Sequence, residues 1–220
     1  MPIPSNYQPP IILSAKERAF EQIQQWIIDG TLKPGEKIND VELAKAIGIS
    51  RTPVREALQL LSMQGFVSMK PGVATTVNES DPKDIDKLLP PLAALESLAA
   101  ELAAPIIEPS DIAALRSLNT DFAAAIHAGN AYPALRIDEQ IHDFIVKLCH
   151  NRYIENTTTM LQAHVRRLFY QRAIVLTKES IAEHNALIDA LAAHDAETAA
   201  HIAKNNWLRP IQCAEMDCRL

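Results

Sequence analysis

The pattern that most constrains the fold of this chain is one short strand-like stretch within a sequence that otherwise favours helices. Residues 66–77 are rich in β-branched side chains and contain a Lys-Pro-Gly turn sequence at 70–72, which together indicate a two-stranded hairpin. From Pro82 onward Ala-, Leu- and Ile-rich amphipathic segments follow one another without a second strand pattern. The sequence therefore predicts a mainly α-helical fold.

Three short helices are predicted before the hairpin. The first begins near Ser14 and places four apolar residues on one face: Ala19, Ile23, Trp26 and Ile27. The second spans about residues 40–47 and is ended by Gly48, and the third spans about 51–63. Helix, helix, tight turn, helix and hairpin form the order of a winged helix-turn-helix, which we predict for residues 14–78.

The second part of the chain, residues 82–213, is predicted to be an antiparallel α-helical bundle. Breaks such as Pro90-Pro91 and Gly129-Asn130 separate its segments. The helices are expected at about 82–88, 91–107, 110–128, 131–149, 151–173, 178–193 and 195–213. Residues 1–13 hold four prolines and are expected to form a flexible tail.

The two parts also differ in charge. Residues 1–78 carry eight Lys/Arg and seven Asp/Glu, a net of +1, whereas the remainder carries thirteen and twenty, a net of −7. The overall charge of −6 therefore does not exclude a nucleic-acid partner for the first part. Different partners are expected for the two domains.

Bulk features predict a cytoplasmic protein without a membrane partner. No apolar run approaches the length of a membrane span, and the N-terminus lacks the pattern of a secretion signal. The three cysteines, Cys149, Cys213 and Cys218, are too scattered for a disulfide framework.

Two arginines lie on one face at the start of the third predicted helix. Arg51 and Arg55 are four residues apart, with Thr52 beside them and Ser50 in position to cap the helix. The planar fork of arginine donors suits guanine edges and phosphates. An isolated pair at this spacing is more often a solvated surface charge. Its place between a glycine turn and a hairpin favours insertion into the major groove.

A longer motif surrounds these arginines. It comprises Leu32-Lys33-Pro34-Gly35-Glu36, Leu43-Ala44, the run from Ile47 to Leu58, Leu61, and Gly65-Phe66-Val67. In residue types and separations, residues 16–77 resemble the GntR family of bacterial transcription regulators. The resemblance implies that Arg51, Thr52 and Arg55 contact DNA, that Ser50 helps at the helix start, and that a homodimer binds a short palindromic operator.

The wing of this motif departs from the family pattern. Its tip usually carries an arginine followed by glycine, and these places hold Val73 and Ala74 here. Lys70 is the nearby cation. The third helix is therefore expected to carry most of the DNA specificity.

Four residues of the second part could converge on a metal ion. Asp138 and His142 are four apart and share one helix face, while His184 and His201 lie on later helices. Such a set of one oxygen and three nitrogen ligands suits Zn²⁺, Ni²⁺ or Mn²⁺ and leaves coordination positions open. Asp-x3-His is also common by chance, and a single histidine in a bundle is usually a surface or core residue.

Residues 82–213 resemble, more loosely, the helical C-terminal (FCD) domain of the FadR-type branch of these regulators. The resemblance implies that these four residues hold a metal and that the domain binds an effector. The branch often has an arginine four residues before the position of Glu96, where it holds an effector carboxylate; this chain has Leu92. Cations on the fifth long helix are expected to meet an anionic effector instead: Arg166, Arg167 or Arg172. Solvated surface charge is the alternative for at least two of them.

The combined prediction is a DNA-binding transcription regulator, not an enzyme, whose operator affinity is controlled by a small carboxylate bound at the metal. One alternative is a regulator for which the metal itself is the signal. Another is a small helical metallohydrolase, but the sequence contains no HExxH motif and this function would leave residues 14–78 unexplained.

Overall fold

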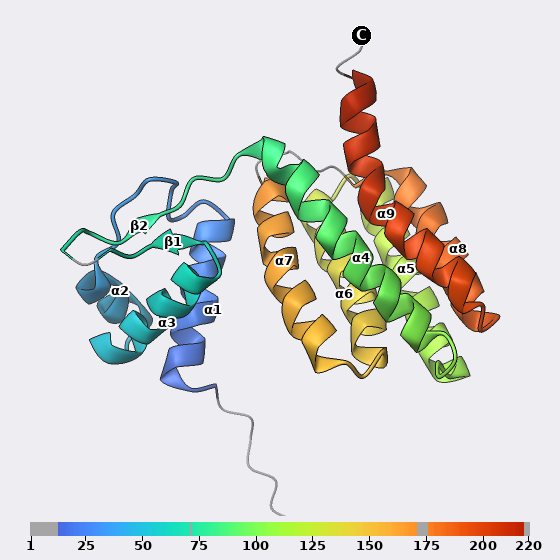
Figure 1. Ribbon diagram of the computed structural model, residues 1–220, viewed down its shortest axis with the longest axis horizontal. Coiled ribbons are helices and arrows are strands. Elements are labelled where there is room, and N and C mark those ends of the chain that lie inside the picture. The colour runs from blue at the N-terminus through green and yellow to red at the C-terminus, as the bar shows by residue number, and fades with distance from the viewer. Residues whose placement is uncertain (1–12, 71, 171–175, 218–220) are drawn as a thin grey trace, which may run out of the picture. The chain divides into compact units, whose positions relative to one another are not determined.

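The computed structural model describes residues 13–70, 72–170 and 176–217, which form two compact units divided between Ser80 and Asp81 (Figure 1). Its described residues are predominantly helical and contain one two-stranded sheet. The mainly α fold predicted from the sequence is therefore confirmed. The expected tail lies almost wholly outside the described residues, as do Arg172 and the side chains of Cys213 and Cys218.

The first unit is built from three helices with clear local start and stop signals. Ser14 caps α1 (Ala15–Ile28) through a capping box with Glu17, and Asn39 caps α2 (Asp40–Ile47). α2 ends at Gly48, whose φ of 73° gives the left-handed turn before α3 (Arg51–Met63). The apolar faces of these helices form the core of the unit, with Ala19, Ile23, Ile27, Leu43, Val54, Leu58 and Leu61 buried.

The predicted hairpin closes this unit. β1 (Val67–Ser68) pairs antiparallel with β2 (Thr76–Val77), with Val67 opposite Val77. At the turn, the N–H of Val73 donates to the carbonyl of Lys70, and Gly72 has a φ of 73°. An isolated bridge from Lys37 to Thr76 ties the segment before α2 to the sheet, a contact that the sequence pattern did not predict.

The second unit is a bundle of helices in which α4 is central (Figure 1). A short 3₁₀ segment, η1 (Pro82–Asp84), leads into the bundle. The helices are α4 (Ile85–Ala103), α5 (Pro109–His127), α6 (Ala131–Leu148), α7 (Arg152–Tyr170), α8 (Lys178–Ala192) and α9 (Ala196–Asp217). α4 packs against α6, α7 and α9, so its side chains reach the middle of the unit.

One predicted helix break does not exist. α4 continues through Pro90 and Pro91, which were expected to separate two helices. Each proline removes one backbone hydrogen bond, but the carbonyls left free belong to Asp86 and Lys87, which are exposed to water. Leu89, Leu92 and Ala93 are fully buried beside the prolines, and their packing favours one continuous helix.

Candidate metal centre and nucleic-acid interface

The start of α3 presents its polar face to solvent. Val54 and Leu58 are buried on the opposite face, which fixes the rotation of the helix in the first unit. The side chains of Arg51 and Arg55 are 52% and 60% exposed, and Thr52 is exposed beside them. Ser50 is the N-cap residue, although its side chain makes no capping hydrogen bond.

Both arginines share one carboxylate, that of Asp40 at the start of α2. Arg51 Nη2 lies 3.1 Å from Asp40 Oδ2, and Arg55 Nε lies 2.5 Å from the same oxygen. The hydrogen bond from Arg55 is the main cause that holds the pKa of Asp40 below its usual value. Sequence reasoning missed this contact, although Asp40 directly follows the N-cap of α2 and so lies at a predictable place.

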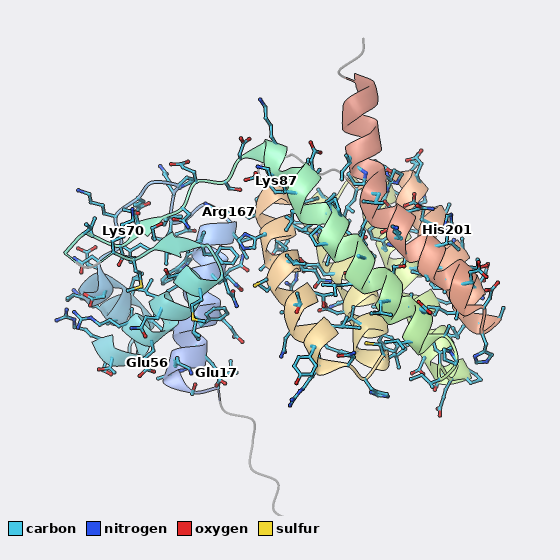
Figure 2. All side chains as sticks on the ribbon, viewed as in Figure 1. Glu17, Glu56, Lys70, Lys87, Arg167 and His201 are labelled. Carbon is cyan, nitrogen blue, oxygen red and sulfur yellow. The ribbon has the colours of Figure 1, made fainter. Side chains whose placement is uncertain are left out.

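A groove of about 860 Å³ runs between α3 and the wing. Asp40 and Arg55 line it together with Lys70 and Val73 of the wing turn. Lys70 is exposed (Figure 2). Val73 is 63% exposed, so the wing tip presents an apolar side chain to solvent. The one described wing cation, Lys70, is thus placed beside the arginine face of α3.

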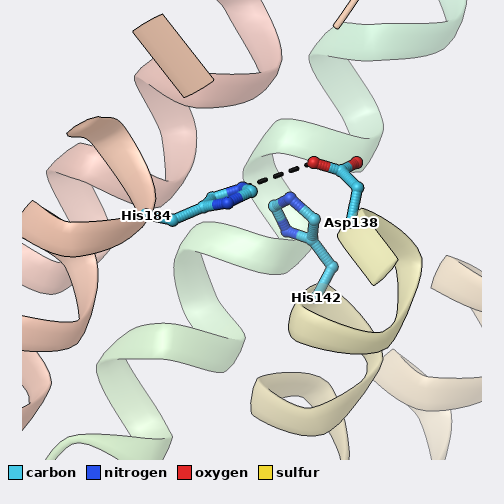
Figure 3. A group of neighbouring side chains, drawn as sticks. All are labelled: Asp138, His142 and His184. Atoms are coloured by element: carbon cyan, nitrogen blue, oxygen red, sulfur yellow. Dashed lines mark ion pairs between the residues drawn. The ribbon is translucent and has the colours of Figure 1, made fainter. Parts of the chain in front are cut away.

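In the second unit, the structure brings three of the four predicted metal ligands together. Asp138 and His142 come from α6 and His184 from α8, and one ligand atom from each lies within 4.8 Å of the others (Figure 3). All three residues are buried, with exposed fractions of 6%, 2% and 1%. Burial of a carboxylate with two imidazoles needs compensating partners.

Hydrogen bonds set which nitrogen of each histidine faces this group. His142 Nδ1 lies 2.6 Å from Oε2 of Glu96 on α4, and His184 Nδ1 lies 3.2 Å from Oδ1 of Asn119 on α5. With Nδ1–H donating in both cases, Nε2 of each ring is the electron-pair donor when the ring is neutral. Such outer hydrogen bonds orient metal-binding histidines.

The surroundings of His184 Nε2 indicate what this group of side chains could bind. This nitrogen lies 3.3 Å from Asp138 Oδ1 but makes no hydrogen bond, although it is buried (Figure 3). A buried nitrogen without a hydrogen-bond partner is costly unless something else binds it. The residues present therefore fit a divalent transition metal.

Glu96 of α4 lies beside the candidate ligand His142. Its carboxylate accepts from Gln162 Nε2 at 2.9 Å and Trp207 Nε1 at 2.7 Å as well as from His142. Burial alone would lower the pKa of His142, but the charge of Glu96 and its hydrogen bond raise that pKa to about 9. The raised pKa favours the protonated form of His142 when no metal is bound.

His201 does not join the group, and its prediction as the fourth ligand is wrong for this structure. It lies on α9 with an exposed side chain, and its Nε2 is 2.8 Å from Asn205 Nδ2 (Figure 2). Ala199, Ala203 and Trp207 define the buried face of α9 at a spacing of four residues. His201 is two residues from Ala199, about 200° around the helix, and so points away from the bundle.

The arginine that lines a cavity with the candidate ligand Asp138 is not one of those expected from the sequence. Arg166 forms an ion pair with Glu139, with Nε 3.3 Å from Oε1, and Arg167 is buried on α7. Arg209 on α9, which sequence reasoning did not single out, lines a cavity of about 30 Å³ together with Asp138. Its guanidinium donates to Glu183, Ser180 and Thr177, which hold it in place.

Family models match both parts of the chain. The model "Bacterial regulatory proteins, gntR family" matches residues 15–77, and the FCD domain model matches residues 91–207. The chain belongs to the GntR family of bacterial regulatory proteins. Its matched domains are those of DNA-binding transcription regulators with an FCD domain and not of enzymes, so the comparisons give no support to the metallohydrolase alternative.

Related proteins agree with this assignment. The uncharacterized regulator YdhC of Bacillus subtilis is 32% identical over 152 residues, which cover 69% of this chain and 66% of YdhC. The Nta operon transcriptional regulator of Aminobacter aminovorans is 33% identical over 136 residues, covering 61% of this chain and 63% of that protein. The alignments thus span just under two thirds of these two relatives.

A solved structure supports the fold of this GntR regulator along nearly its whole length. Escherichia coli McbR/YncC aligns with a TM-score of 0.76 at 25% identity, covering 94% of this chain and 99% of McbR/YncC. A GntR regulator from Rhodococcus sp. RHA1 aligns with a TM-score of 0.68 at 20% identity and supports the fold alone. Within the described part of the chain, no helix has the length and apolar character needed to span a membrane.

Proposed function

We propose that this GntR regulator is a homodimer whose affinity for its operator is controlled by a small carboxylate bound at a divalent transition metal in the FCD domain. The metal would be held by Asp138, His142 and His184. The buried Nε2 of His184, which lies 3.3 Å from Asp138 Oδ1 but makes no hydrogen bond, is the observation that carries the proposal. A cytoplasmic location accords with an operator as the partner.

The donor set restricts the ion. One carboxylate oxygen and two imidazole nitrogens suit Zn²⁺, Ni²⁺ or Mn²⁺ rather than Ca²⁺ or Mg²⁺, which prefer oxygen ligands. Three protein ligands leave coordination positions free, as at metal sites that bind an exogenous ligand. A bound metal would supply these positions as Lewis-acid contacts for a carboxylate oxygen.

Arg209 is the cation that we assign to the effector, in place of Arg166 or Arg167. It lines the cavity that Asp138 also lines, and Ser180 and Asn206 add polar groups to the same wall. By this measure, 30 Å³ corresponds to the space of about two water molecules. A carboxylate group fits this volume, whereas a larger effector requires the cavity to open.

The effector would control DNA binding because the two binding equilibria are linked. An effector that binds one arrangement of the bundle better than another increases the population of that arrangement. In a dimer, this shift would change the placement of the two DNA-binding units. Asp138, His142 and His184 come from two helices, and Arg209 comes from a third. Ligand binding between these helices can therefore change their packing.

The test uses DNA sequences enriched by the wild-type protein from a random duplex library. We expect a subset of small carboxylates, for example acetate, lactate or citrate, to change the affinity of the metal-loaded protein for the enriched duplex and to have no effect after chelation. A change in affinity caused by metal alone, with no further effect of any carboxylate, would identify the metal as the signal instead.

A further inference from the structure

We infer that Asp40 is a specificity-determining residue of the DNA interface: it holds Arg51 and Arg55 in one orientation and keeps them from binding phosphates indiscriminately. The inference rests on the proposed DNA contacts of the two arginines. Asp40 itself belongs to α2 and was not among the expected contact residues. Its role follows from its position between two guanidinium groups.

The geometry fixes both side chains at once. Asp40 Oδ1 and Oδ2 accept from Arg51 Nη2 at 3.2 and 3.1 Å, and Oδ2 also accepts from Arg55 Nε at 2.5 Å. The Asp40 side chain is 20% exposed, so it is held against the unit, while the arginines remain more than half exposed. A free arginine side chain samples many rotamers, and this shared carboxylate selects a subset before DNA arrives.

The contacts leave donors available on both arginines. Arg55 uses Nε for Asp40, so its two terminal nitrogens are not engaged by this contact, and Arg51 uses Nη2 alone. A guanidinium has five N–H donors in a planar fork, and two parallel donors suffice for a guanine edge. The pairing with Asp40 is thus compatible with direct reading of bases.

The charge of Asp40 opposes the competing binding mode. Two arginines and one aspartate have a net charge of +1 instead of +2, and the carboxylate faces the groove beside the wing. Non-specific binding depends on neutralising phosphates, and a nearby carboxylate repels them. Lys70 is the described cation of the wing, so few charges act at this surface. The single charge of Asp40 therefore has a large influence on the ratio of specific to non-specific DNA binding.

The test compares Asp40→Asn with Glu42→Gln. Glu42 is exposed on the same helix and the change removes the same charge, without removing a carboxylate that binds the two arginines. Anisotropy titrations use a duplex enriched from a random library by the wild-type protein and a scrambled duplex of the same composition. Asp40→Asn should bind the scrambled duplex more tightly, make its log–log salt slope more negative by about 0.9, and lower the specific-to-scrambled ratio roughly fivefold or more. Glu42→Gln should lower that ratio at most slightly.

Three further variants distinguish a failure of this inference from a failure of the proposed DNA contacts. Asp40→Glu retains the charge and should restore at least part of the ratio, which a purely structural role at the start of α2 would not require; circular dichroism melts check folding. If Arg51→Ala and Arg55→Ala lower the ratio while Asp40→Asn behaves like Glu42→Gln, the role of Asp40 is wrong. If the arginine variants keep the wild-type ratio, the proposed contacts themselves are wrong, and the inference with them.

Discussion

Arg51 and Arg55 are exposed, and their ion pairs with Asp40 are expected to contribute little to the free energy of unfolding. Pairs between exposed side chains contribute roughly 0–1 kcal/mol, because solvent screens them and ordering the side chains opposes them. Here one carboxylate orders two arginines on the helix that the fold presents to solvent. A role in recognition accounts for this arrangement better than a role in folding.

At this scale the first prediction concerns DNA contacts. Arg51→Ala and Arg55→Ala should each weaken specific operator binding by about 1–3 kcal/mol, the range for one good base contact, and together abolish it. Because both side chains are more than half exposed, the melting temperature should change little. Lys16→Ala, an exposed change on α1, serves as the control in a mobility-shift titration. Wild-type affinity in both arginine variants would contradict the assignment.

A second prediction concerns the proton on His142. Because the pKa of His142 is raised to about 9 without a metal, a proton must leave before the imidazole can bind one. Metal affinity should therefore be highest above pH 9 and fall by up to about tenfold per pH unit below it, rather than only below the ordinary value of about 6.5.

Glu96→Gln gives the matched measurement. The substitution removes the charge that raises the pKa of His142, so the decline in metal affinity should begin at lower pH than in wild type. Glu101→Gln, an exposed change on the same helix, should leave the profile unchanged. Isothermal titrations at several pH values measure it, and identical profiles for Glu96→Gln and wild type would exclude this coupling.

Among the elements, those with strong local signals could be predicted from the sequence. The helices of the first unit and the hairpin lie where their turns and periodicity placed them, although Asn39 and not Asp40 is the N-cap of α2. α4 differed because buried leucines, which belong to tertiary packing, outweighed the local effect of Pro90 and Pro91. A proline pair in the sequence indicates only the local preference of the backbone and not the effect of tertiary packing.

The same division applies to the candidate site. Asp138 and His142 could be paired from their spacing, since residues four apart share a helix face. His201 could not be placed, because the rotation of α9 depends on which of its faces packs against α4. Glu96 and Asn119 lie on other helices, and no spacing within α6 or α8 points to them. Their roles emerge only when the bundle is assembled.

The exposed turn of the wing allows a test of whether the wing approaches DNA. Val73→Arg should strengthen DNA binding and make the log–log salt slope more negative by about 0.9, because the exposed turn would add one phosphate contact. Val73→Gln, which adds polar length without charge, should not change the slope. Unchanged affinity and slope in the arginine variant would mean that the wing does not approach DNA.

The whole molecule combines two units with separate chemistry. The first presents two exposed arginines at the start of α3, and the second buries a carboxylate and two imidazoles where a metal and an anion could bind. Regulation requires that ligand binding in the second unit change the DNA affinity of the first, and by linkage operator binding must change effector affinity by the same factor. The metal is the premise on which this coupling depends.

Elemental analysis of the protein, purified without chelators or a metal-affinity tag, tests that premise most directly. We expect about one divalent transition metal per chain in wild type, a large loss in His142→Ala, and wild-type content in His201→Ala and His164→Ala, which alter histidines outside the group. The loss in His142→Ala should be accompanied by lower thermal stability and no carboxylate response. Sub-stoichiometric metal in wild type that His142→Ala does not change, or a loss in His201→Ala equal to that in His142→Ala, would contradict a metal site formed by Asp138, His142 and His184.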